Sequence, residues 1–257
     1  MNDFFTGLLS DKKGGITFQC FSIWHFGYIF LFMILATIFA LYLINKDARK
    51  IERCIIAWIR IAFGLYIADF FLMPLAYGQI DVEKLPFHIC TTMCVLCFLS
   101  RHNRFFRRFK LQFAALGFVS NLVYLLYPAG VMWYNVHPLS YRAAQTLIFH
   151  GIMVVYGFLV LCFEKDGFAW RKCHRDLVLI VAMTAWAWVG NTVYNSQSMV
   201  YNWFFLVQDP FSMFPRDIAP MIMPVLNIVL FFVAVMLVYF LFMELLRRGR
   251  RKEKAIL

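Results

Sequence analysis

The chain has 257 residues, of which 62% are apolar and 15% charged, and its formal net charge is +11. A soluble domain is nearer half apolar and a quarter charged, and it could not cover 30 Phe, 13 Met, 12 Tyr and 7 Trp without large exposed apolar patches. The composition therefore excludes an ordinary soluble domain. It predicts an all-α polytopic membrane helix bundle whose outer surface is solvated by lipid.

Hydrophobic segments of roughly 20 residues, the length needed to cross a bilayer, recur along the whole chain. About seven transmembrane helices are predicted, forming a single transmembrane domain over residues 1–257, with spans near 22–45, 54–76, 85–100, 110–131, 142–163, 175–196 and 217–246. The third span is short, and Pro86 suits its first turn because the N–H that proline lacks would be unbonded there. Pro128 predicts a broken outer turn at the end of the fourth span. Pro220 and Pro224 predict a late start or a kink in the seventh.

Basic residues alternate between the two sides of this predicted bundle. Most Lys and Arg lie within 46–53, 101–110, 165–175 and the basic tail 247–257, whereas the opposite connections hold only Lys12, Lys13, Lys84, Arg142 and Arg216. Because basic loops stay in the cytoplasm, the N-terminus is predicted outside and the C-terminus inside. Topology then explains the net charge, so we expect membrane phospholipids as partners rather than nucleic acid. The sequence does not predict the oligomeric state.

Seven cysteines are spread over the chain, most of them within apolar segments. Cys94 and Cys97 have the spacing of a metal-binding pair, but they lie inside one predicted span and no second pair accompanies them. Metal ligation needs converging thiolates, and thiolates are costly in lipid. We therefore expect packing roles for most of the cysteines, and neither a metal nor another cofactor.

Polar side chains within the apolar spans are costly, which makes them candidates for function. They gather in the outer halves of the predicted spans and in the last outer connection, which predicts one polar cavity that opens away from the cytoplasm. On an ideal helix His88, Thr91 and Thr92 share a face, whereas Cys90 lies about 200° from His88. For each polar residue the alternative is an interhelical hydrogen bond without further function. The candidates in the outer region are Asp69, His88, Gln145, His150, Asn191, Asn195, Asn202 and Asp209.

An ordered set of short motifs resembles a known family. The segment Leu85-Pro-Phe-His-Ile-Cys-Thr-Thr-Met93 is similar to the start of a span in small bacterial membrane proteins of the YwaF type and in the eukaryotic transmembrane protein 164 family. Three further matches follow in the same order, namely Phe109-Lys-Leu-Gln112, His150, and Asn202 with Asp209-Pro-Phe211. The resemblance runs from the second span to the seventh and implies a multi-pass protein of the bacterial cytoplasmic membrane.

The same resemblance implies a chemistry. The eukaryotic members are described as acyltransferases that move a fatty acyl chain between phospholipids, with a cysteine just before the family histidine as the proposed nucleophile. Phe87 stands at that position here, so the family nucleophile does not carry over.

Two classes of function fit these residues. The first is a phospholipid acyltransferase or lipid hydrolase at the outer leaflet, which needs a nucleophile, a base and donors for the oxyanion. Its candidates are Cys90, Thr91 or Thr92 as nucleophile, His88 or His150 as base, Asp69 to orient a histidine, Asn191 or Asn195 as donors, and Gln145, Asn202 and Asp209 as further substrate contacts.

The second class is a non-enzymatic binding protein or transporter for a small solute or lipid, with Asp69 and the two histidines as a proton-coupled site. An accessory subunit without either activity is the third interpretation. Polar residues become sparse toward the predicted cytoplasmic side, which favours a cavity open on one side over a transport path.

Overall fold

The computed structural model describes residues 16–78, 82–132, 134–164, 170–196, 200–210 and 212–256. Every regular element within these residues is a helix, which confirms the predicted all-α class. The elements are α2 (Ile23–Leu43), α3 (Ala48–Tyr77), η1 (Val82–Lys84), α4 (Ile89–His102), α5 (Arg104–Arg107), α6 (Lys110–Leu126), α7 (Ala129–Met132), α8 (Tyr141–Phe163), η3 (Trp170–Lys172), α9 (His174–Tyr194), η4 (Trp203–Phe205) and α10 (Ala219–Ile256).

Six segments of the described chain are helical, long and apolar enough to cross a membrane: Ile23–Leu43, Ala48–Leu75, Lys110–Met132, Tyr141–Phe163, Trp170–Tyr194 and Ala219–Met243. The predicted third span differs, because its helix α4 has only 14 residues. At 1.5 Å per residue it is about 21 Å long, shorter than the roughly 30 Å of a hydrocarbon core. Residues 85–88 are not helical and lead into α4 from the side of the predicted cavity.

Two prolines lie where the sequence predicted irregular helix ends. The helix predicted at 110–131 is interrupted at Tyr127 and Pro128, and it resumes as the short α7, in agreement with the expected broken turn. In the last span Pro224 lies inside α10, near the start of a helix that begins at Ala219.

Helix α3 begins before the start of the predicted second span. The side chain of Asp47 caps it by accepting a hydrogen bond from the Lys50 amide at 2.9 Å.

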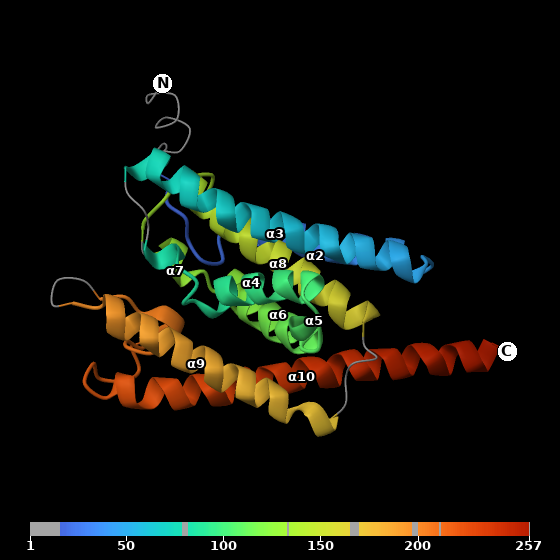
Figure 1. The fold of residues 1–257 in the computed structure, drawn as a ribbon. Helices are drawn as coiled ribbons and strands as arrows, with labels where there is room; N and C mark the ends of the chain where they lie inside the picture. The colour runs from blue at the N-terminus through green and yellow to red at the C-terminus, as the bar shows by residue number, and fades with distance from the viewer. Residues whose placement is uncertain are drawn as a thin grey trace.

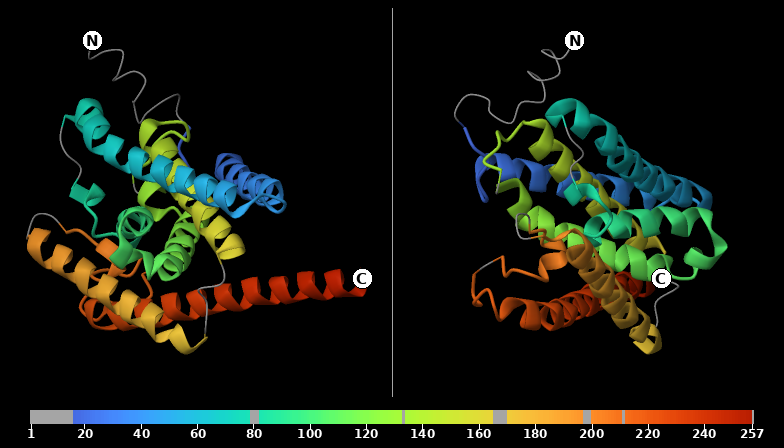
Figure 2. Two further views of the ribbon diagram at one scale, coloured as in Figure 1. Left: turned by 45° about the vertical axis from the view of Figure 1, so that its right-hand side comes forward. Right: turned by 60° about the vertical axis from the view of Figure 1, so that its left-hand side comes forward.

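The helices form three groups that run roughly side by side (Figures 1 and 2). The α2–α3 pair and the α9–α10 pair lie on opposite sides, with α4, α6 and α8 between them. Helix α8 is the most enclosed, and Leu147, Met153, Tyr156 and Leu159 along it are fully buried. The outer helices α2 and α10 expose many large apolar side chains, as a lipid-facing surface requires.

Helix α8 approaches α6 closely because Gly157 has no side chain. A Cβ at this position would lie 2.6 Å from the Cβ of Phe118 and 3.0 Å from the carbonyl oxygen of Ala114. Gly64 in α3 is different, since a Cβ there would meet nothing within 4 Å. The α6–α8 contact therefore depends on a glycine, as is common where membrane helices pack.

The connections that are rich in Lys and Arg lie toward one end of the bundle. The α2–α3 turn, α5 and the start of α9 lie toward the same side as the C-terminal end of α10, on the right in Figure 1. Helix α7 and the last turns of α3 and α9 lie at the opposite end. Which end faces the cytoplasm stays a prediction from the distribution of charge.

An ion-pair network connects three helical segments at the end of the bundle that holds the basic connections. Glu164, just after α8, pairs with Arg101 at 2.6 Å and with Lys110 at 2.8 Å. Burial raises the pKa of the Glu164 carboxyl, but the two cations lower it by more, so that the pKa lies below its ordinary value. The carboxylate is therefore charged at neutral pH and connects α8 to α4 and α6.

Candidate functional site

A pocket of about 120 Å³ lies among α3, α4, α6, α8 and the segments η1, α7 and η4. Its wall contains seven of the residues that the sequence singled out, and these come from four different parts of the chain. They are Asp69, His88, Cys90, Thr91, Gln145, His150 and Asn202. The other wall residues include Tyr66, Glu83, Lys84, Tyr124, Tyr134, Arg142, Thr146, Trp203 and Phe205.

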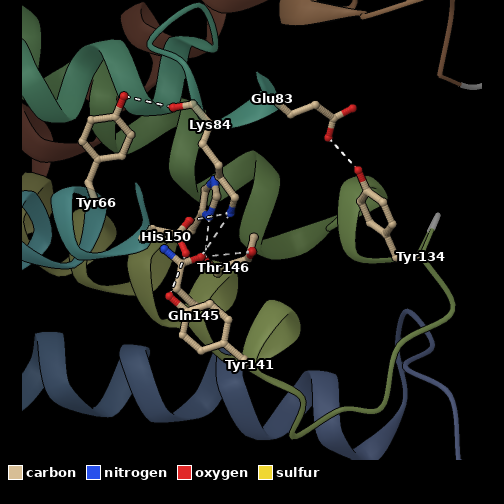
Figure 3. Close-up of polar contacts among 9 residues, drawn as sticks. Tyr66, Glu83, Lys84, Tyr134, Tyr141, Gln145, Thr146 and His150 are labelled. Atoms are coloured by element: carbon tan, nitrogen blue, oxygen red, sulfur yellow. Dashed lines mark hydrogen bonds and ion pairs between the residues drawn. The ribbon is translucent and has the colours of Figure 1, made fainter. Parts of the chain in front are cut away.

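An ion pair between Asp69 and Lys84 forms one charged part of the wall. Asp69 is 1% exposed, and its Oδ2 lies 2.9 Å from the Nζ of Lys84. The hydroxyl of Tyr141 donates to Oδ1 of the same carboxylate at 2.7 Å, and Lys84 donates to Oε1 of Gln145 at 3.3 Å. The hydroxyl of Tyr66 donates to the backbone carbonyl of Lys84 at 3.0 Å, which holds η1 against α3 (Figure 3). Asp69 thus holds a lysine and a tyrosine, not a histidine.

His150 is fixed by its own helix and by a neighbouring ring. Its Nδ1 donates to the carbonyl oxygen of Thr146 at 2.7 Å, because a carbonyl can only accept. The ring of Tyr124 stacks on the imidazole, with 3.9 Å between centroids and 12° between planes. In the neutral imidazole the proton on Nδ1 leaves Nε2 as an acceptor. His150 lies close to Lys84, Gln145 and Thr146 in Figure 3.

His88 and Cys90 both line the pocket, although ideal helical spacing placed them on different faces. The reason is that α4 begins at Ile89, while His88 has an extended backbone with φ −72° and ψ 139°. Thr91 and Thr92 use their hydroxyls within the same segment. Thr91 donates to the carbonyl of His88 at 2.9 Å, and Thr92 donates to the carbonyls of Pro86 and His88 at 2.7 and 2.9 Å.

The asparagines predicted as oxyanion donors hold the backbone that follows α9. Asn191 donates to the carbonyl of Trp203 at 3.0 Å and accepts from its amide at 2.9 Å. Asn195 makes the same pair of bonds with Tyr201, at 3.1 and 2.6 Å. Both side chains therefore position the segment that carries Trp203. A direct role in chemistry stays a prediction for each of them.

Two further predicted residues, Asn202 and Asp209, also bond to the backbone of this segment. Asn202 lines the pocket, donates to the carbonyl of Gln208 at 2.8 Å and accepts from two backbone amides. Asp209 accepts from the amides of Met213 and Phe214 at 2.5 and 3.0 Å. Over its described residues, the connection between α9 and α10 is thus held by side chains that bond to its own backbone. Phe211, part of the sequence motif, lies outside those residues.

Phe87, at the position where the sequence resemblance implied a cysteine in the family, belongs to an aromatic cluster. Its ring lies 5.0 Å from the rings of both Trp186 and Trp203 and 5.8 Å from that of Tyr194. Gly190 leaves room for it, since a Cβ there would be 2.5 Å from the Phe87 ring. A phenyl ring can neither attack an ester nor transfer a proton, so the position serves packing in this chain.

Several charged and aromatic residues of the site escaped the sequence analysis. Lys84 and Arg142 were counted only as charges of outer connections. The guanidinium of Arg142 lies 3.9 Å above the ring of Tyr134, whose hydroxyl donates to Glu83 at 2.9 Å. The Tyr134–Glu83 pair lies apart from the Lys84–Gln145 contact in Figure 3. The available signal for Lys84 and Arg142 was their position next to span ends, because such residues can fold back into a cavity.

None of the described His, Cys, Asp and Glu side chains form a group of three or more that could hold a metal ion. The pocket wall carries imidazole, thiol, carboxylate, amine, guanidinium, amide and hydroxyl groups.

The helices define a polytopic helical membrane protein, and a pocket with several polar side chains lies inside its bundle. The TMEM164 family model matches residues 20–244, which include every described wall residue of the pocket. The chain belongs to the TMEM164 family, and the resemblance seen in its motifs is confirmed at that level. No curated protein and no solved structure matches the chain.

Proposed function

We propose that this protein is a lipid-ester acyltransferase or hydrolase that receives the ester region of a membrane phospholipid in the pocket. The observation that carries the proposal is His150, whose Nδ1 is committed to the Thr146 carbonyl and whose ring is clamped by Tyr124. This arrangement leaves Nε2 as the proton acceptor, and a positioned neutral imidazole is the commonest general base. A pocket of about 120 Å³ suits an ester and its neighbouring carbons, while the acyl chains stay in the bilayer.

Cys90 is the nucleophile that fits this base best. It lines the same pocket, whereas the hydroxyls of Thr91 and Thr92 donate to backbone carbonyls. His150 would take the thiol proton while the sulfur attacks the ester carbonyl carbon. The ester C–O bond then breaks, and the leaving lysophospholipid oxygen takes the proton from His150. A second lysophospholipid hydroxyl, or water, then attacks the thioester carbonyl carbon while His150 takes its proton. The C–S bond breaks, and His150 returns that proton to the Cys90 sulfur, which regenerates the thiol.

The charged groups of the wall serve binding in this proposal. Lys84, held by Asp69 and Gln145, places a cation beside the reacting groups, where it attracts the lipid phosphate. The pocket lies at the end of the bundle opposite the basic connections. If those connections face the cytoplasm, the site acts at the outer leaflet of the cell membrane.

The test is acyl transfer by the purified protein in vesicles that contain a diacyl phospholipid and an isotope-labelled lysophospholipid. Mass spectrometry then follows the labelled diacyl product and free fatty acid. We expect His150→Asn and Cys90→Ala each to lower turnover by at least about 100-fold, the lower range for a lost base. His102→Asn and Cys94→Ala are the controls. His102 makes the same bond to a carbonyl four residues earlier, and Cys94 is buried in α4 but not part of the wall.

Full turnover in both pocket variants would exclude this mechanism. Turnover lost in His150→Asn but kept in Cys90→Ala would assign direct activation of water or of the lysophospholipid hydroxyl, without a thioester.

A second function, binding of a small solute or lipid without chemistry, is favoured by the Asp69–Lys84 pair. Two buried opposite charges can exchange a proton or a ligand without any covalent step. If the wild-type protein forms no labelled product in the same vesicles but retains phospholipid through purification, this binding function replaces the enzymatic one.

A further inference from the structure

The indole of Trp203 is a buried donor without an acceptor in the part of the chain that the structure describes. The residue is 0% exposed and lines the pocket, and no described residue accepts a hydrogen bond from its Nε1. Buried tryptophan N–H groups usually find one, because an unsatisfied buried donor costs free energy. The neighbouring Trp186, although 43% exposed, has an acceptor, since its Nε1 donates to the Pro86 carbonyl at 2.6 Å. The missing acceptor of Trp203 points to a group that the pocket receives.

The position of this indole is determined from both sides. Asn191 bonds to the amide and the carbonyl of Trp203, as described above. The ring of Tyr201 stacks on the indole with 4.9 Å between centroids and 9° between planes, and Phe87 packs against it at 5.0 Å. A donor held this firmly loses little freedom when a ligand binds, which is the property of a prepared binding group.

The backbone next to Trp203 is strained, and it is held in that state. Phe204 and Phe205 have φ values of 58° and 52°, in the left-handed region that bulky residues rarely adopt. Asn227 in α10 donates to the carbonyl of Phe204 at 2.7 Å and so ties the strained turn to the last helix. Strain of this kind persists only where surrounding contacts impose it, and it concentrates at functional sites.

We propose that the Nε1–H of Trp203 donates to the carbonyl oxygen of the ester bound in the pocket. The inference rests on the proposed function and names the group that recognises the ester. A neutral donor surrounded by aromatic rings suits a neutral acceptor, because burying a charged oxygen there would be costly. The lipid phosphate is better matched by Lys84 and Arg142 elsewhere in the wall.

The experiment compares a diacyl phospholipid with its dialkyl ether analogue of identical head group and chain length, which lacks only the ester carbonyls. Titration of each lipid into the protein in detergent, followed by native mass spectrometry, gives two dissociation constants. We expect the wild-type protein to bind the ester about fivefold more tightly, the effect of one net hydrogen bond. Trp203→Phe should bind both lipids with the affinity that the wild type has for the ether. Replacement of Trp203 by benzothienylalanine, in which sulfur takes the place of the N–H, removes the donor while keeping the ring size. Trp186→Phe is the matched control and should keep the preference.

Loss of ester preference in both Trp203 variants, with unchanged ether affinity, supports the proposal. A preference that persists in the benzothienylalanine variant overturns it, and acyl transfer by the wild type would still support the proposed function. Equal binding of ester and ether by the wild type also overturns it. If neither lipid binds and no acyl transfer is measured, the proposed function fails together with the inference.

Discussion

The substitution Asp69→Asn removes the negative charge of a buried carboxylate but keeps an oxygen that can accept a hydrogen bond. The asparagine keeps an oxygen that can accept from the Tyr141 hydroxyl, but it brings an amide group in place of the oxygen that faces Lys84 at 2.9 Å. The ammonium group then lies in the pocket wall without its counter-charge. The partner substitution Lys84→Met leaves the carboxylate unpaired instead.

The size of the effect follows from the geometry. At 2.9 Å and an effective dielectric constant of about 20, the attraction between the two charges is about 6 kcal/mol. Removing both charges from water offsets much of this, and the Lys84 side chain is still 19% exposed. We therefore expect each single substitution to destabilise the protein by about 3 kcal/mol, at the low end for one partner of a buried pair. The double variant Asp69→Asn with Lys84→Met should lose much less than the two costs added together.

The measurement is unfolding in mixed micelles by titration with sodium dodecyl sulfate, followed by circular dichroism. Asp47→Asn is the control, because the Asp47–Lys50 pair is exposed at 3.7 Å and asparagine caps a helix as well as aspartate does. It should change stability by less than about 1 kcal/mol. If the costs of Asp69→Asn and Lys84→Met simply add in the double variant, the two charges are not coupled and the reasoning is refuted.

Three further outcomes can be measured in the same unfolding assay. Gly157→Ala should destabilise by about 2 kcal/mol or more, because the methyl group meets α6, whereas Gly64→Ala should stabilise by about 0.5–1 kcal/mol. The Glu164 carboxylate contributes stability above its unfolded pKa, and this is lost as the pH falls through its lower folded value. Glu164→Gln should therefore be less stable at pH 7 and decline less toward acid, and an unchanged pH profile would contradict this. Asn191→Ala should cost about 2–4 kcal/mol by leaving the amide and carbonyl of Trp203 unpaired, and a loss below 1 kcal/mol would contradict that role.

The histidines show how far spacing along the sequence can lead. The sequence placed His150 within the fifth predicted span, and in the structure its Nδ1 bonds to the backbone carbonyl of Thr146, four residues earlier on the same helix. His88 was treated as the first turn of a helix, but it is the extended residue before α4. Because α4 begins at Ile89 and not at or before His88, Cys90 lies in the same pocket wall as His88. The residue at which a helix begins depends on tertiary contacts that a sequence pattern does not contain.

The asparagines show the opposite case. Their depth and their spacing on α9 were visible in the sequence, but their partners lie 6 to 12 residues later, in a turn with left-handed residues. Nothing in the sequence indicated that Phe204 and Phe205 would adopt such a backbone, since it is unfavourable for each residue alone. Trp203 precedes these two residues in the same turn, and it was therefore not predicted as part of the pocket.

The sequence by itself determined the membrane class, the approximate positions of the spans and the family. These properties depend on composition, on runs of apolar residues and on short motifs, which are local and additive. Only the tertiary structure decided which polar side chains meet: that Asp69 pairs with Lys84, that Cys90 joins His88 and His150 in one wall, and that Asn191 holds Trp203. The physical reason is that a buried polar group forms its hydrogen bonds with the groups that lie within about 3 Å of it. Which groups lie there depends on how distant segments pack, and therefore on the whole fold.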